Sequence, residues 1–323
     1  MKLALKIDVD TYRGLAEGAD RLAAFLLSQK IPASFFISLG PDRSGAAITR
    51  LFKRKGFARK MRRTGALSLY GWRTVLSGTL LPARPMGTSF PDLLRRWSEQ
   101  GFEVGPHGYD HILWHDQAAI WTEPEARQEL ARAWEVYRAI FSRDPASFAA
   151  PGWQAGPGTW AALDSARLLY HSDTRGEAPY FPVLDSRTLK TLEIPTTLPT
   201  WDEMLAWPGV TAEQLVDRTL ALLRPDALNV WTIHAEVEGS LYFSRFKEFI
   251  MRLQGGNMNW VFLPDFAREL RRTPEQIPQN RIEQAQRPGR AGTVTCQKTE
   301  RAPVLPSSGA PVGHAVNRST GVL

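Results

Sequence analysis

The sequence predicts an α/β protein whose parallel strands close into a distorted barrel, with a basic amphipathic insertion at 42–86 and a disordered tail at 278–323. Three observations predict this fold. Short apolar segments alternate with segments of helical spacing over residues 1–277, which is typical of a parallel sheet built from β-then-α units. Polar residues directly follow several predicted strands, where such barrels place their active sites. The 323 residues are 43% hydrophobic and 23% charged, enough for one large core.

The predicted elements follow in chain order. The first strand, 2–9, is apolar and precedes a helix at 15–29, in which Leu15, Leu22 and Leu26 recur at helical spacing. Further apolar segments predict strands at 33–38, 102–105, 148–150, 168–171, 192–194, 229–233 and 260–263. Helical spacing predicts helices at 123–141, 158–166, 212–223 and 265–271. Two stretches depart from this alternation, the insertion 42–86 and the Pro-, Gly- and Arg-rich tail after Pro278.

Composition also narrows the cellular setting. Cys296 is the single cysteine, so no disulfide partner exists within the chain and a reducing, cytoplasmic compartment is expected. Lys6 and Asp8 interrupt the N-terminal apolar run too early for a signal peptide, and no apolar run is long enough to span a membrane. The net charge is +7, but 42–84 has an excess of ten basic residues and 271–323 an excess of five, which leaves −8 on the rest. This asymmetry predicts an anionic partner.

Three predicted strand ends carry groups suited to one metal site. In K-I-D-V-D-T, Asp8 and Asp10 alternate along a strand, so both point to one side, where one carboxylate could ligate a metal and the other act as a base. In H-G-Y-D-H, His107 and His111 are four residues apart, in a loop after a strand, as joint metal ligation requires. In T-I-H-A-E-V-E-G, His234 directly follows a strand and is suited to acid–base work near neutral pH.

Each motif alone has an ordinary structural explanation. Two acids after a strand can form a turn and cap a helix, an H-x-x-x-H pair can lie on the surface, and a lone histidine can be hydrogen-bonded in the core. The conjunction of three strand ends, which together supply two histidines, an aspartate, an acid and a base, favours a catalytic metal centre.

At these motifs, and over residues 1–270, the chain resembles the polysaccharide deacetylase (NodB-homology) family. The resemblance implies a barrel of the NodB-homology type, with Asp8 as base, Asp10, His107 and His111 as ligands of one divalent metal ion, and His234 as the acid that protonates the leaving amine. The one-residue spacing in K-I-D-V-D differs from the adjacent acids of the chitin and peptidoglycan enzymes. The metal is not readable, because two histidines and one aspartate suit zinc, manganese or cobalt.

The chain departs from the family at one position. The family has an arginine that orients the base two residues before a proline, and here Ala149 occupies that position in F-A-A-P-G-W-Q. Asp173 of S-D-T-R-G matches the family's acid that orients the catalytic histidine, and Arg175 is a candidate replacement for the missing arginine.

A narrower resemblance concerns the substrate. The segments E-V-G-P-H-G-Y-D-H, A-A-P-G-W-Q, S-D-T-R-G, E-I-P-T-T-L-P-T-W-D and T-I-H-A-E-V-E-G are together similar to a subfamily of deformylases of lipid A modification. This resemblance implies removal of formate from 4-deoxy-4-formamido-L-arabinose linked to undecaprenyl phosphate, a step toward resistance to polymyxin. For a formamide, the tetrahedral oxyanion is expected at the metal and at a backbone N–H of Gly152 or Trp153.

The insertion predicts contact with an anionic membrane surface, since basic residues beside Trp and Leu at helical spacing are typical of an interfacial helix. The candidate docking residues are Lys53, Arg54, Lys55, Lys60, Arg62, Arg63, Trp72, Leu76 and Leu80. The alternative is a solvated face packed on the barrel. A nucleic-acid partner is not expected, because the basic run lacks interleaved aromatic residues. The expected location is therefore peripheral, at the cytoplasmic face of a bacterial inner membrane.

Two other functions stay open at this point. One is a deacetylase of another amino sugar or a cyclic-amide hydrolase of the same superfamily. The other is a catalytically silent module that binds a membrane or nucleic acid, against which the complete set of acids and histidines argues.

Overall fold

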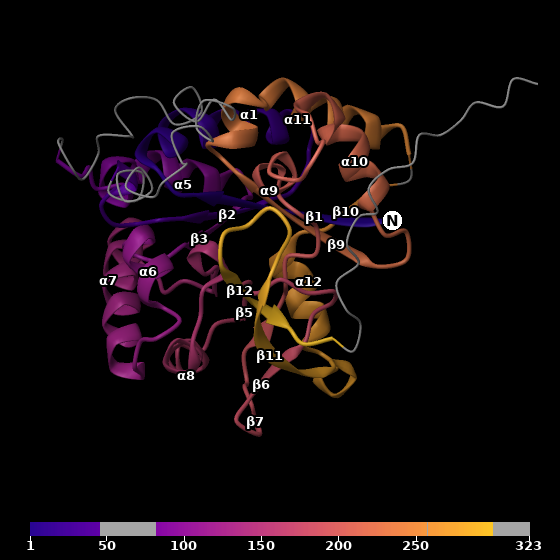
Figure 1. Ribbon diagram of the computed structural model, residues 1–323. Coiled ribbons are helices and arrows are strands. Elements are labelled where there is room, and N and C mark those ends of the chain that lie inside the picture. Colours follow the sequence, from indigo (N-terminus) through magenta and orange to yellow (C-terminus); the bar gives the residue numbers. More distant parts are fainter. Residues whose placement is uncertain (46–81, 257, 300–323) are drawn as a thin grey trace, which may run out of the picture.

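The computed structural model describes residues 1–45, 82–256 and 258–299 (Figure 1). The helices are α1 (Asp20–Ser28), α5 (Pro91–Glu99), α6 (His111–Gln117), α7 (Glu123–Phe141), α8 (Pro157–Ser165), α9 (Trp201–Leu205), α10 (Leu215–Leu222), α11 (Phe243–Gln254) and α12 (Leu263–Leu270). The strands are β1 (Lys2–Val9), β2 (Ser34–Ile37), β3 (Glu103–Pro106), β4 (Ser147–Phe148), β5 (Tyr170–His171), β6 (Phe181–Leu184), β7 (Arg187–Thr188), β8 (Leu192–Glu193), β9 (Leu228–His234), β10 (Asn259–Trp260), β11 (Gln279–Gln286) and β12 (Thr293–Gln297).

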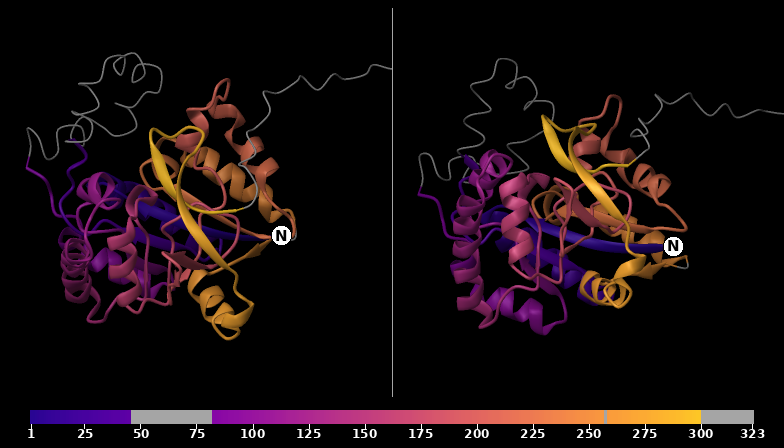
Figure 2. Two further views of the ribbon diagram at one scale, coloured as in Figure 1. Left: turned by 60° about the horizontal axis from the view of Figure 1, so that its bottom comes forward. Right: turned by 90° about the horizontal axis from the view of Figure 1, so that it is seen from below.

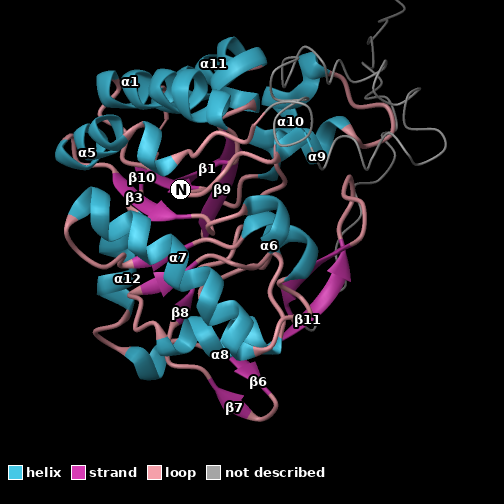
Figure 3. Cartoon of the chain, turned by 90° about the vertical axis from the view of Figure 1, so that its left-hand side faces the viewer, coloured by secondary structure: helices cyan, strands magenta, loops and turns pink. Residues whose placement is uncertain are grey.

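Parallel strands form a distorted barrel, which confirms the predicted fold class. Parallel pairing joins β9 to β1, β1 to β2 and β2 to β3, and a second parallel sheet runs from β4 through β5 to β8. Backbone hydrogen bonds from residues after β4 and after β8 join these sheets. The N–H of Ala149 donates to the Pro106 carbonyl at 3.3 Å, and the N–H of Thr197 donates to the Val230 carbonyl at 3.0 Å. Helices lie around the parallel strands of the barrel (Figure 3). Because these strands run parallel, their carboxyl ends meet at one mouth of the barrel.

The alternation of β1 separates the outer core from the barrel interior. Leu3 and Ile7 pack in the large apolar cluster that also contains Leu22 of α1. Ala4 packs instead in a cluster with Phe36, Tyr170 and Val230, which come from other strands of the barrel. Successive side chains of a strand point to opposite faces. The even-numbered residues Lys6 and Asp8 therefore face the barrel interior with Ala4.

The predicted disordered tail is wrong for residues 278–299. Strand β11 pairs with β6 and with β12, and Figure 2 shows the resulting yellow hairpin crossing in front of the barrel strands. Val294 and Cys296 of β12 are buried against Trp153. The segment is ordered because a neighbouring strand satisfies its backbone groups, although its sequence has few apolar residues. Residues 300–323 lie outside the described part of the chain.

The described ends of the insertion 42–86 meet each other. The N–H of Asp42 donates to the Arg84 carbonyl at 2.8 Å, and the N–H of Met86 donates to the Gly40 carbonyl at 2.8 Å. The predicted docking residues, Lys53, Arg54, Lys55, Lys60, Arg62, Arg63, Trp72, Leu76 and Leu80, lie outside the described residues. Among the helices that are described, none combines the length and the apolar character needed to cross a membrane.

Candidate active site

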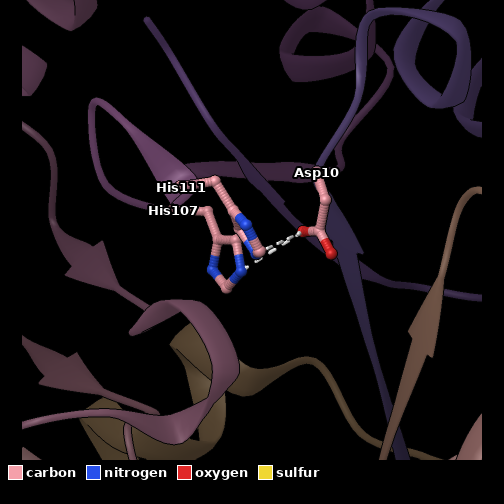
Figure 4. Close-up of side chains that lie close together, drawn as sticks. All are labelled: Asp10, His107 and His111. Atoms are coloured by element: carbon pink, nitrogen blue, oxygen red, sulfur yellow. Dashed lines mark ion pairs between the residues drawn. The ribbon is translucent and has the colours of Figure 1, made fainter. Parts of the chain in front are cut away.

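Three side chains converge at the carboxyl end of β1 (Figure 4). Asp10 follows β1, His107 follows β3 and His111 is the first residue of α6. The Nε2 atoms of both imidazoles lie 3.4 Å from Asp10 Oδ1. Atoms that bind one tetrahedral ion at about 2.1 Å are themselves about 3.4 Å apart, so this spacing suits a divalent cation. Among the described residues, Asp10 Oδ1 has no hydrogen-bond partner, which leaves it free to be a ligand atom.

The local sequence orients both imidazoles. His107 Nδ1 lies 2.8 Å from the Ala149 carbonyl oxygen, so Nδ1–H donates there and Nε2 keeps its lone pair toward Asp10. Asp110 is the N-cap of α6 and accepts a hydrogen bond from the Leu113 N–H at 3.0 Å, which fixes the start of the helix at His111. Gly108, with φ of +74°, provides the left-handed turn between the two histidines.

The electrostatics of these three residues also suit a cation. Burial lowers the pKa of His111 to about 3 and lowers the pKa of His107 well below its usual value. Both imidazoles are therefore neutral at physiological pH, the form that ligates metals. Burial raises the pKa of Asp10 to about 7, because an ionised carboxylate is costly there without a cation beside it. The residues present thus fit a divalent metal ion.

Asp8 lies next to this cluster and pairs with a buried lysine. Its Oδ2 is 3.9 Å from His107 Nε2 and 3.4 Å from Lys6 Nζ, and Lys6 is fully buried. Lys6 also donates to the Ser172 carbonyl at 3.2 Å, and its Nζ lies 5.5 Å from the centre of the Trp153 ring. Lys6 is therefore the cation that pairs with Asp8 within the described part of the chain.

The expectation that Arg175 replaces the missing arginine is wrong. Its guanidinium pairs with both oxygens of Glu203, at 2.6 and 2.9 Å, and donates to the Leu198 carbonyl at 2.8 Å. Arg175 comes from a loop beside β12, whereas Lys6 comes from β1 and shares its interior face with Asp8. The position two residues before Asp8 thus supplies a cation beside it.

His234, the last residue of β9, is oriented by Asp202 and not by Asp173. Its Nδ1 lies 3.2 Å from Asp202 Oδ1, and its backbone N–H donates to Glu238 Oε2 at 2.8 Å. Burial lowers the pKa of His234, but Asp202 and the other nearby acids outweigh burial and hold it well above its usual value. The expected role of Asp173 is therefore wrong, since its carboxylate accepts a hydrogen bond from the Ala150 N–H at 2.7 Å and lies 3.2 Å from His171.

One pocket of about 270 Å³ joins these groups. Its lining comprises Asp10, His107, His111, Ile112, His115, Gly152, Trp153, Asp202, His234, Glu236, Val237 and Arg290. Glu236 Oε1 accepts hydrogen bonds from the N–H groups of Asp10 and Thr11, at 3.0 and 2.8 Å, and so fixes the backbone at Asp10. The backbone N–H of Trp153 donates to the Ala150 carbonyl at 3.1 Å, so this amide is already engaged.

The fold and this pocket define a class of protein. An α/β barrel whose strand ends unite two histidines, two aspartates and an acid-paired histidine is suited to hydrolysis by acid–base catalysis beside a cation. The polysaccharide deacetylase family model matches residues 4–170. The chain belongs to the polysaccharide deacetylase family, and it is a hydrolase acting on amide bonds.

Two curated relatives are more specific. The chain is 34% identical to "Probable 4-deoxy-4-formamido-L-arabinose-phosphoundecaprenol deformylase ArnD" of Shewanella sediminis (strain HAW-EB3), over 80% of this chain and 84% of that protein. It is 29% identical to the protein of the same name from Wigglesworthia glossinidia brevipalpis, over 88% of this chain and 98% of that protein. A solved structure described as a probable polysaccharide deacetylase from Pseudomonas aeruginosa PAO1 matches the fold with a TM-score of 0.56 at 16% identity, over 84% of this chain and 91% of that one.

Sequence reasoning did not single out four residues of this region: Lys6, Asp202, Glu236 and Arg290. A lone lysine two residues before Asp8 in an apolar strand was a readable signal, because both residues must share one face. Asp202 lies in the quoted segment E-I-P-T-T-L-P-T-W-D, but its approach to His234 depends on how the chain folds back after β8.

Proposed function

We propose that this protein is a metal-dependent deformylase that removes formate from 4-deoxy-4-formamido-L-arabinose linked to undecaprenyl phosphate. The observation that carries this proposal is that Asp10, His107 and His111 line one pocket with His234, while Asp8 Oδ2 lies 3.9 Å from His107 Nε2. The names of the two curated relatives support the choice of substrate. The product would be the free amino sugar that is used in lipid A modification.

In this proposal Asp10, His107 and His111 hold one divalent ion. When bound, such an ion polarises the formamide carbonyl and makes water more acidic. Asp8 accepts the proton of the attacking water, and Lys6 holds the Asp8 carboxylate in place from the barrel interior. His234 donates a proton from Nε2 to the departing amine, because Asp202 occupies its Nδ1 side and favours the protonated ring.

The oxyanion donor is proposed to be Gly152. This residue lines the pocket with φ of +61°, and a Cβ atom built there would lie 2.5 Å from the His115 ring. The positive φ and this close contact favour glycine at the position. Trp153, the other residue predicted for this role, has its backbone N–H engaged by Ala150.

The test of the proposal is mass spectrometry of lipid products. The purified chain, loaded with zinc, manganese or cobalt, is incubated with the formamido-sugar lipid and with its acetamido analogue. We expect a loss of formyl mass from the first lipid and slower or no change in the second. Hydrolysis of the acetamido lipid in preference would contradict the deformylase assignment and favour a deacetylase.

Two variants separate the roles of the site residues. Asp8→Asn should abolish turnover while metal content stays near one ion per chain, because Asp8 is a base and not a ligand. His107→Ala should lose metal and activity together. Loss of metal from Asp8→Asn would mean that the roles of Asp8 and Asp10 are exchanged. Elemental analysis of both variants beside the parent protein provides the measurement.

We also propose that insertion 42–86 docks the protein on the anionic cytoplasmic face of the inner membrane. Two contacts join the described base of the insertion to the site region. Asp42 Oδ2 accepts a hydrogen bond from the Tyr12 N–H at 3.0 Å, and Arg43 Nη1 lies 2.8 Å from Asp110, the N-cap of α6. These contacts tie the described base of the insertion to the segment after Asp10 and to the start of α6, and this supports the proposal that a bound membrane presents a lipid-linked sugar to the pocket.

Sedimentation with anionic vesicles tests the docking. Each basic residue near an anionic surface contributes about 1 kcal/mol, so neutralising Lys53, Arg54, Lys55, Lys60, Arg62 and Arg63 should release the protein, as should high salt. Polar replacements of Trp72, Leu76 and Leu80 should weaken binding even at low salt, because buried apolar side chains contribute about 1.5–3 kcal/mol each. Complete sedimentation of the charge-neutralised protein would refute docking by this segment.

A further inference from the structure

Arg290 belongs to the connection between β11 and β12, and several contacts seat this connection over the site. The backbone N–H of Arg175 donates to the Thr295 carbonyl at 3.0 Å, and Gln154 Nε2 donates to the Thr293 carbonyl at 2.6 Å. Gly289, with φ of +86°, approaches α9 so closely that a Cβ atom there would lie 2.1 Å from the Glu203 carbonyl oxygen. The hairpin therefore holds Arg290 in one place at the pocket wall.

The guanidinium of Arg290 is largely buried and only partly satisfied. Its side chain is 16% exposed, and its centre lies 4.8 Å from the centre of the Trp153 ring. Among the described residues its Nε–H has no hydrogen-bond partner. A buried guanidinium with an unused donor is costly unless an acceptor from outside completes it.

The acids beside Arg290 are already engaged. Its Nη1 lies 3.6 Å from Glu203 Oε1, beyond hydrogen-bond distance, while Arg175 binds both oxygens of Glu203 at 2.6 and 2.9 Å. Asp202, the neighbouring acid of the pocket, pairs with His234 at 3.2 Å. Two guanidinium groups thus share the one Glu203 carboxylate, which leaves a positive charge at this wall.

We propose that Arg290 binds the phosphate group of the lipid-linked sugar. This inference rests on the proposed function, in which the substrate carries a phosphate on the sugar ring that presents its formamide to Asp10, His107 and His111. All of these residues line the same pocket. A guanidinium can donate two parallel hydrogen bonds to phosphate oxygens, which an ammonium cannot match. Arg290 thereby selects a sugar phosphate over an uncharged glycoside.

The experiment compares two substrates with three variants of the full-length chain. The substrates are the formamido sugar on a short prenyl phosphate and the methyl glycoside of the same sugar. The variants are Arg290→Ala, Arg290→Lys and the matched control Arg281→Ala, which removes one positive charge from an exposed position on β11. Melting temperatures are measured first to show that each variant folds. If Arg290→Ala does not fold, the comparison of the two substrates is made with Arg290→Lys.

We expect Arg290→Ala to raise KM for the prenyl phosphate substrate about 10- to 100-fold more than KM for the methyl glycoside, the range for losing hydrogen bonds to a charged group. Arg290→Lys should show a smaller difference, and Arg281→Ala none. Competitive inhibition by methyl phosphate should weaken in parallel, whereas inhibition by inorganic phosphate alone would indicate a site for the free ion and overturn the inference. Equal losses on both substrates would also overturn it, because Arg290 would then only support the site.

A binding measurement separates this inference from the proposed function. If the parent protein hydrolyses neither substrate, the deformylase proposal fails. Calorimetric titration with the prenyl phosphate sugar still tests Arg290, since weaker binding by Arg290→Ala than by Arg281→Ala supports phosphate recognition. Equal binding by these two variants refutes it.

Discussion

Replacing Lys6 by methionine removes the cation from a buried ion pair while it preserves most of the side-chain volume. Lys6 is fully buried, and its Nζ lies 3.4 Å from Asp8 Oδ2. At an effective dielectric constant of about 20, two unit charges at this distance attract each other by about 5 kcal/mol. Removing one member of a buried pair is measured to cost about 3–5 kcal/mol, because the other charge is left uncompensated. The attraction worked from the distance and the measured cost of removing one partner are thus of similar size.

We therefore expect Lys6→Met to lower the free energy of unfolding by about 3–5 kcal/mol, and the melting temperature by about 6–20 °C. Turnover should fall as well, since the Asp8 carboxylate loses the contact that holds it. Bound metal should remain, because Lys6 contacts none of the three proposed ligands. Urea unfolding, a turnover assay and elemental analysis measure the three quantities separately.

Two further variants make this prediction decisive. The double variant Lys6→Met/Asp8→Asn should recover part of the lost stability without recovering activity, since no unpaired charge is then buried. Lys2→Met is the matched control, because Lys2 lies on the same strand and on the same side but is exposed. A Lys6→Met protein as stable and active as Lys2→Met would refute the role given to Lys6.

Three shorter predictions test other features. Asp202→Asn should lower the pKa of His234, because it removes the carboxylate that stabilises the protonated ring. The fall of kcat/KM at alkaline pH should then begin at a lower pH than in the parent protein, and an unchanged pH profile would argue against His234 as the acid. Gly289→Ala should raise KM more than Gly292→Ala, because both glycines have positive φ but only a Cβ atom at Gly289 meets the Glu203 carbonyl. Equal effects of the two substitutions on KM would show that this close approach is unimportant. Chelation with EDTA should abolish turnover and lower the melting temperature, and zinc, manganese or cobalt should restore both; activity that survives full metal removal would contradict the proposed chemistry.

The alternation of strands and helices was the most predictable part of this protein. The helix expected at 123–141 matches α7, because a capping box at Thr122 and an apolar stripe mark both its start and its buried face. Helix α11 was not predicted, although Phe246, Phe249, Ile250 and Leu253 recur at helical spacing and are buried. The spacing of these four residues is therefore a local signal that indicates a helix.

Other features could not be read from local sequence. Asp173 follows the short strand β5, and Asp202 lies in α9, which follows the short strand β8. Only the course of the loop after β8 decides which of the two carboxylates reaches His234. Strand β11 is ordered because it pairs with β6, roughly a hundred residues earlier in the chain, and its own composition does not predict a strand. Pairing between distant segments leaves no periodic signal in either one.

The meeting of the two ends of insertion 42–86 has a consequence for how this protein can vary. Because Asp42 and Arg84 are hydrogen-bonded at the base, the described chain enters and leaves the inserted segment at one place on the barrel. Lengthening such a closed loop is cheap, at about 0.6 kcal/mol for each doubling. Under the docking proposed above, attachment to a surface and the chemistry at the strand ends would diverge separately, and a segment grafted between Asp42 and Arg84 would change the surface bound while Asp10, His107 and His111 stay in place.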